Sequence, residues 1–251
     1  MTSPWQKIRT TPGSDLNWLW LPGWSFSADV FETFYDELPG HHWAAEYLNS
    51  AVSFEAAAAR LAATAPGTGD GVNLPAVWIG WSLGGALAAN AFSATPDPRN
   101  QFLVTLATGP RFLSDKTGNG MPREDFEAFS QSLTSNAETT LKRFTGLCAH
   151  GSSEARSLMK QLKGSQHPVQ SELSHTLEWL RYEDLPPSLR SLHLYGHADA
   201  IKPSRMPPAE LSPGESHTFF LTTEGKHHLL ERLHQLAEQL QHESAKREKM
   251  Q

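Results

Sequence analysis

Short apolar segments alternate with helical patterns along most of this chain. The segments 16–21, 43–48, 76–80, 101–107, 191–196 and 217–221 have the length and composition of buried strands. Helical patterns begin near Phe54 and Ala86, and another follows the last segment. Strands that alternate with helices are typical of a mostly parallel sheet with helices on both faces. We therefore expect an α/β fold with such a sheet at its centre.

One long region breaks this alternation. Residues 109–187 contain no convincing strand, but they contain four helical patterns, at 123–133, 137–147, 153–163 and 169–182. We interpret 109–187 as a helical lid inserted into a core formed by 1–108 and 188–251. In the third pattern the apolar residues recur at the spacing of one helix face and are predicted to pack together: they are Ala155, Leu158, Met159 and Leu162.

The third apolar segment runs directly into Gly80-Trp81-Ser82-Leu83-Gly84-Gly85. A strand, Gly-x-Ser-x-Gly and a helix in this order form the nucleophile elbow of an α/β-hydrolase, which holds the serine at the tip of a tight turn. The two flanking glycines are needed because larger side chains there would collide. Ser82 is therefore the candidate nucleophile, the alternative being a serine that merely caps a helix.

An acid and a base should follow such a serine, in that order. Asp199 lies in the turn after segment 191–196, and His227 follows segment 217–221. Both positions come just after predicted strands, at the edge where open α/β sheets build their sites. We predict that His227 takes the proton of Ser82 and that Asp199 orients the imidazole.

Both assignments have an alternative. His228 competes with its neighbour, although Gly225-Lys226-His227 has the Gly-x-His spacing common before hydrolase histidines. Asp199 has the alternative of an ordinary turn aspartate.

The oxyanion hole of such an enzyme consists of two main-chain amides. One belongs to the residue after the nucleophile, here Leu83. The other comes from a loop after an earlier strand, and Leu21-Pro22-Gly23-Trp24 fits that loop, with Trp24 as the donor.

At this point the chain resembles a known family, the pimeloyl-[acyl-carrier protein] methyl ester esterases of biotin synthesis (BioH type). The resemblance extends from about Leu16 to Leu240. It rests on Gly23-Trp24, Gly80-Trp81-Ser82-Leu83-Gly84-Gly85, Leu194-Tyr195-Gly196 with Asp199 and Pro203, and Thr140-Leu141-Lys142-Arg143-Phe144. It implies substrate contacts at Trp24, Ser82, Leu83, the segment from Phe144 to Cys148, and His227. Our candidates for the walls of an acyl channel, which could equally be core residues, are Trp24, Trp81, Phe112 and Phe144.

The chain also departs from the family's pattern. The family's Asp-x-Pro-Gly-x-Gly loop is shortened here to Asn49-Ser50, and Glu37-Leu38-Pro39-Gly40 lies too early, so we interpret it as a turn. The family's His-Ala-Pro-Phe after the catalytic histidine is replaced by His227-His228-Leu229-Leu230.

Composition limits the partners, cofactors and cellular compartment that we expect for this chain. The chain of 251 residues carries a net charge of −6, which argues against a nucleic-acid partner. Its one cysteine, Cys148, cannot form an intrachain disulfide, and the sequence has no signal-like or membrane-spanning apolar stretch. The spacing of the histidines does not support a metal site. We expect a cytoplasmic monomer without cofactor, metal or membrane association.

The lid nevertheless carries a concentration of positive charge. Arg156, Lys160 and Lys163 share one helical face, and Lys142 and Arg143 lie on the preceding helix. A solvated helix face is one interpretation. The resemblance implies another, in which Lys142, Arg143, Arg156 and Lys160 dock an acidic acyl-carrier protein.

These observations predict a serine esterase. The expected reaction is hydrolysis of the methyl ester of pimeloyl-acyl-carrier protein to the free carboxylate and methanol. The alternative is a broad-specificity carboxylesterase or thioesterase on small acyl substrates, which would use the same triad. A non-catalytic binding protein of hydrolase fold is a third interpretation, against which the Ser, Asp, His set argues.

Overall fold

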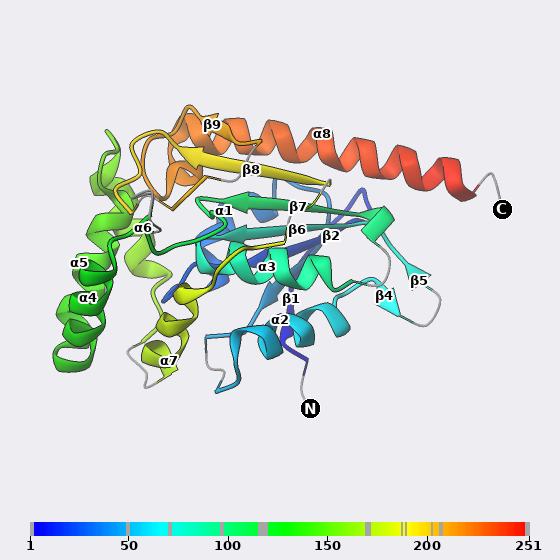
Figure 1. The fold of residues 1–251 in the computed structure, drawn as a ribbon. Helices are drawn as coiled ribbons and strands as arrows, with labels where there is room; N and C mark the ends of the chain where they lie inside the picture. The colour runs from blue at the N-terminus through cyan, green and yellow to red at the C-terminus, as the bar shows by residue number, and fades with distance from the viewer. Residues whose placement is uncertain are drawn as a thin grey trace.

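A seven-stranded sheet forms the centre of the protein in a computed structural model (Figure 1). The structure describes residues 3–48, 51–69, 72–95, 98–114, 120–168, 172–186, 188, 190–201, 203–205 and 208–248. The strand order is β1-β3-β2-β6-β7-β8-β9. The strands are β1 (Trp5–Thr11), β2 (Asn17–Leu21), β3 (Gly40–Ala45), β6 (Ala76–Trp81), β7 (Gln101–Leu106), β8 (Ser191–Gly196) and β9 (Glu210–Ser212). Strand β1 pairs antiparallel with β3, and the pairs from β3 to β9 are parallel. The expected α/β fold is therefore confirmed.

Helices cover the sheet. Helix α3 (Leu83–Ser93) packs against β6 and β7, and α2 (Phe54–Ala63) lies beside α3 (Figure 1). The long α8 (Thr223–Glu248) runs next to β9. All residues of β2 and β6 are buried, as expected for parallel strands covered on both faces. The smaller elements are the 3-10 turns η1 (Ala28–Phe31), η2 (Pro98–Asn100) and η4 (Phe219–Leu221), the helix α1 (Glu32–Tyr35), and the hairpin of β4 (Thr68–Gly69) and β5 (Val72–Asn73).

Five of the six predicted strands are present, with small shifts at their ends. The prediction of a strand at 217–221 is wrong. Its apolar residues form the 3-10 turn η4, and the last strand is instead the earlier β9. A short apolar run does not distinguish a buried strand from another buried element. Because of this error, the loop after the last strand lies earlier in the chain than predicted.

The region between β7 and β8 is helical, as expected. It contains α4 (Arg123–Ser135), α5 (Ala137–Ala149), α6 (Ala155–Gly164) and α7 (Glu172–Glu178), followed by the 3-10 turn η3 (Trp179–Arg181). These helices lie at the carboxyl ends of the parallel strands (Figure 1); we keep the name lid for residues 109–187. In α6 Leu158 and Leu162 are buried, but Met159 is 40% exposed, so its predicted packing is wrong.

Candidate active site

Ser82 lies at the junction of β6 and α3, in the backbone geometry of a nucleophile elbow. Its φ of 55° and ψ of −120° fall in a region that residues other than glycine rarely adopt. A Cβ on Gly80 would come within 2.4 Å of Gly85 Cα, and a Cβ on Gly84 within 2.2 Å of the Pro22 carbonyl oxygen. The glycines of the motif thus let the strand, the turn and the helix approach closely, which leaves Ser82 at the tip.

Asp199 lies in the turn after β8 and pairs with His217, which belongs to the loop between β9 and η4. The distance between Asp199 Oδ2 and His217 Nδ1 is 2.7 Å. The other carboxylate oxygen, Oδ1, accepts the Ile201 amide at 2.8 Å. Both side chains are buried, so the carboxylate holds the imidazole in one orientation away from bulk solvent.

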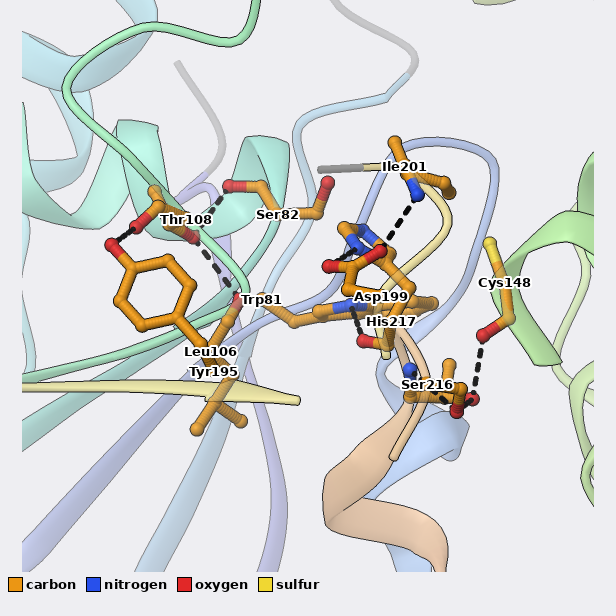
Figure 2. Close-up of polar contacts among 11 residues, drawn as sticks. Trp81, Ser82, Leu106, Thr108, Cys148, Tyr195, Asp199, Ile201, Ser216 and His217 are labelled. Carbon is orange, nitrogen blue, oxygen red and sulfur yellow. Dashed lines mark hydrogen bonds and ion pairs between the residues drawn. The ribbon is translucent and has the colours of Figure 1, made fainter. Parts of the chain in front are cut away.

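The other ring nitrogen of His217, Nε2, is also buried, and within the described residues it has no hydrogen-bond partner. Figure 2 shows the Ser82 side chain pointing toward the Asp199–His217 pair. A carboxylate on Nδ1, a second ring nitrogen and a nearby serine are the groups that a serine hydrolase triad uses.

The structure does not place the predicted base, His227, beside Asp199. His227 is exposed near the start of α8, where it lines a surface cavity of about 450 Å³ together with Pro213 and Glu231. His228 Nε2 lies 2.8 Å from Glu210 Oε1. Neither of these two histidines is the partner of Asp199; that partner is His217.

The choice of His227 followed from the wrongly predicted strand at 217–221. Because β9 ends at Ser212, the loop after the last strand carries His217 and not His227. One sequence signal pointed to it: His217-Thr218-Phe219-Phe220 has a phenylalanine three residues after the histidine, as in the family's His-Ala-Pro-Phe.

Two contacts hold the His217 loop in place. Trp81 donates its indole N–H to the His217 carbonyl oxygen at 3.0 Å, which joins the loop to the elbow. Thr218 donates its hydroxyl to the Cys148 carbonyl at 3.1 Å, which joins it to α5 of the lid (Figure 2). Burial, with the Asp199 charge adding to it, raises the pKa of the Cys148 thiol, so this group stays neutral beside the site.

The two residues predicted for the oxyanion hole flank the elbow. Leu83 is the first residue of α3, where helix amides lack intrahelical partners. Trp24 follows Gly23, which lies so close to the elbow that a Cβ on it would come within 2.8 Å of the Trp81 ring. The Trp24 indole donates to the Leu173 carbonyl oxygen of α7 at 3.0 Å, so its side chain links this loop to the lid.

Aromatic rings cluster between the elbow and the lid. Trp24 lies 5.2 Å from Phe144 and 5.7 Å from Phe129, between ring centroids. Phe26 joins this group to Trp81, at 5.0 Å. Phe26 and Phe129 were not predicted for this cluster. Phe112, which was, is buried in the segment after β7.

The four cations predicted for docking are exposed on two adjoining helices. Lys142 and Arg143 lie on α5, and Arg156 and Lys160 lie on α6, which packs against α5. In the part of the chain that the structure describes, none of the four forms an ion pair. Their charge is therefore directed outward.

The described ranges hold no group of three histidine, cysteine or carboxylate side chains able to bind a metal ion. Likewise, no helix among them is both long and apolar enough to span a bilayer.

Comparisons with known proteins identify the family of this chain. Residues 18–239 match the model of the alpha/beta hydrolase family. The pimeloyl-[acyl-carrier protein] methyl ester esterase of Salmonella agona is 31% identical over 207 residues, which are 75% of this chain and 77% of the relative.

Solved structures show the same fold. An esterase from Exiguobacterium antarcticum superposes with a TM-score of 0.72 at 16% identity, covering 93% of this chain and 94% of the other. A hydrolase from Oleispira antarctica gives 0.66 at 16% identity, over 90% and 94% of the two chains. At such identities the likeness extends to the fold alone.

Proposed function

Because this chain belongs to the α/β-hydrolase family, in its BioH-type branch, we propose that it is a serine esterase with Ser82 as nucleophile. The observation that carries this proposal is the Asp199–His217 pair at 2.7 Å, whose buried Nε2 has no partner in the described structure. An aspartate on one ring nitrogen and an elbow serine whose side chain points toward the pair are the groups needed for ester cleavage.

The reaction proceeds in two stages. His217 Nε2 takes the proton of the Ser82 hydroxyl as its oxygen attacks the ester carbonyl, and the Leu83 and Trp24 amides stabilise the oxyanion. Collapse of the tetrahedral intermediate releases the alcohol, which receives the proton from His217. Water, deprotonated by the same nitrogen, then hydrolyses the acyl-enzyme and frees Ser82. No metal or organic cofactor takes part in this scheme.

The substrate we propose is the methyl ester of pimeloyl-acyl-carrier protein, cleaved to the carboxylate and methanol. The name of the Salmonella relative supports this choice. Two features of this chain agree with it. The aromatic cluster at Trp24, Phe129 and Phe144 suits an apolar acyl chain, and the outward cations of α5 and α6 suit an acidic carrier protein. Such a role in biotin synthesis would place the enzyme in the cytoplasm.

A paired assay tests both levels of the proposal. The purified protein should hydrolyse a short p-nitrophenyl ester and the methylated carrier-protein substrate, with the higher kcat/KM for the latter. Ser82→Ala should abolish both activities. Activity on the small ester alone would favour a broad carboxylesterase or thioesterase, and activity on neither would favour a non-catalytic protein of this fold.

A further inference from the structure

The segment 108–111, through which the chain leaves β7 for the lid, touches the nucleophile's backbone. The Thr108 hydroxyl donates to the Ser82 carbonyl oxygen at 2.9 Å and approaches the Leu106 carbonyl oxygen at 3.2 Å. Tyr195, on β8, donates its phenol to the Thr108 carbonyl oxygen (Figure 2). A Cβ on Gly85 would come within 2.0 Å of the Thr108 hydroxyl oxygen, so the elbow has room for this contact because residue 85 is glycine.

The same segment is bonded to the loop that carries the acid. Ser204, five positions after Asp199 in the chain, donates its hydroxyl to the Arg111 carbonyl oxygen at 2.7 Å and accepts the Arg111 amide at 3.1 Å. The Ser204 amide also donates to the Arg111 carbonyl oxygen at 3.3 Å. A Cβ on Gly109 would come within 1.5 Å of the Ser204 carbonyl oxygen, so the two backbones are in direct contact.

Residues near the carboxyl end of the lid also bind this segment. Tyr182 donates its hydroxyl to the Gly109 carbonyl oxygen at 3.0 Å. The Arg111 guanidinium contacts both carboxylate oxygens of Asp184 at 2.9 Å. The segment is thus held where the lid leaves the core and where it returns.

We propose that Thr108 and Ser204 are positioning residues, through which segment 108–111 sets Ser82 and Asp199 relative to each other. This inference rests on the proposed function, because it takes these two residues as nucleophile and acid. The left-handed backbone of Ser82 is strained and persists only where its surroundings fix it. The Thr108 hydroxyl supplies one such restraint, and Ser204 anchors the chain beyond Asp199.

The expected effect of losing either hydroxyl is on turnover. Misplacement of reacting groups by about 1 Å can cost on the order of 10²-fold in rate, and a partial displacement costs less. Thr108→Ala and Ser204→Ala should each lower kcat for a p-nitrophenyl ester about tenfold, with KM within about twofold, because neither side chain binds substrate. Thr108→Ser keeps the hydroxyl and should restore most of the turnover.

A matched control is available on β7, just before this segment. Thr105 is also buried, and its hydroxyl contacts His193 Nδ1 at 2.7 Å. Thr105→Ala should lower the melting temperature about as much as Thr108→Ala while leaving kcat unchanged, which separates loss of stability from loss of positioning.

The experiment measures kcat, KM, melting temperature and the rate of labelling by a fluorophosphonate probe in the full-length protein. A parent protein that neither labels nor turns over would overturn the proposed function, and this inference with it. In an active parent, unchanged kcat in Thr108→Ala and Ser204→Ala would overturn the inference alone. So would an equal loss of kcat in Thr105→Ala, or no recovery in Thr108→Ser.

Discussion

His217 Nδ1 lies 2.7 Å from Asp199 Oδ2, and this contact joins two loops that are separated by β9 in the chain. Asp199 follows β8 and His217 follows β9, which pairs parallel with β8. Neighbouring parallel strands bring the loops after them to the same edge of the sheet, so Asp199 and His217 meet beside the elbow.

The first prediction concerns this base. His217→Ala should reduce turnover nearly as far as Ser82→Ala, because members of a triad act as a unit; losses on the order of 10⁵ to 10⁶ are expected. His227→Ala and His228→Ala are the matched controls and should stay within about twofold. Steady-state turnover of a p-nitrophenyl ester measures all four variants. A large loss in either control, with His217→Ala active, would return the base to α8.

A second prediction concerns the acid. Asp199→Asn should lower kcat on the order of 10⁴-fold, since an amide favours the wrong tautomer of the imidazole. Glu210→Gln, which alters the carboxylate beside His228, serves as a control and should keep turnover within about twofold. Single-turnover acylation measured by stopped flow gives the numbers. A loss below about tenfold in Asp199→Asn would mean that another group orients His217.

Local sequence signals predicted the elbow, whereas the last strand had no such signal. The segment from Ala76 to Ala91 contains a fully buried strand, the glycines and a helix in one continuous stretch, so Ser82 was placed without tertiary information. Strand β9 is three residues long, and its central Leu211 is 51% exposed. No apolar pattern marks such an edge strand, and the buried Phe219-Phe220-Leu221 nearby has the composition of one.

Two other differences between the sequence and the structure have causes of their own. Strand β1 lies at the sheet edge with most of its residues exposed, so its sequence lacks the alternation that predicts a strand. Met159 has helical spacing to Leu162, yet it lies at the margin of the buried stripe of α6 and remains exposed. Spacing predicts which residues share a helix face, but the neighbouring helices determine how wide the buried part of that face is.

A third prediction concerns stability at acid pH. Burial lowers the pKa of His42 to about 4 from its ordinary 6.5. The ring is held neutral, because Nδ1 accepts the Trp20 indole N–H at 3.1 Å and Nε2 lies 2.9 Å from the Leu38 carbonyl oxygen, to which it donates. As pH falls below 6.5, His42 binds a proton in the unfolded chain, whereas in the folded protein it stays neutral until about pH 4. The contribution of His42 to the free energy of unfolding should therefore decrease from about pH 6.5 to about pH 4 and change no further below that.

Denaturant titrations at several pH values test this dependence. His42→Gln should be less stable than the parent at neutral pH but should lose less on acidification, so the two curves converge toward pH 4. Burial also lowers the pKa of His193, so part of the slope should survive in His42→Gln. An unchanged slope in that variant would contradict the prediction.

The last prediction concerns the lid surface, where a carrier-protein esterase and a general esterase differ. If Lys142, Arg143, Arg156 and Lys160 attract an acidic carrier protein, reversing all four to glutamate should raise KM for the carrier-linked ester steeply. Turnover of a small ester should hardly change, because the reversed side chains are exposed on α5 and α6. The effect should shrink as salt rises, since exposed charges are screened over about 8 Å at physiological ionic strength.

A double variant with a matched control makes the test specific. Lys142→Glu with Lys160→Glu changes the net charge by the same amount as Lys7→Glu with Lys246→Glu, at exposed lysines on β1 and near the end of α8. The end of α8 lies away from the lid (Figure 1). Only the lid pair should impair kcat/KM for the carrier-linked ester across a salt series. Equal impairment by both pairs would mean that the overall charge of the protein, and not the lid surface, causes the loss of kcat/KM. No impairment by either would leave the lid cations as a solvated face and favour the broad-specificity esterase, because the remaining support for a carrier-bound substrate would be the relative's name alone.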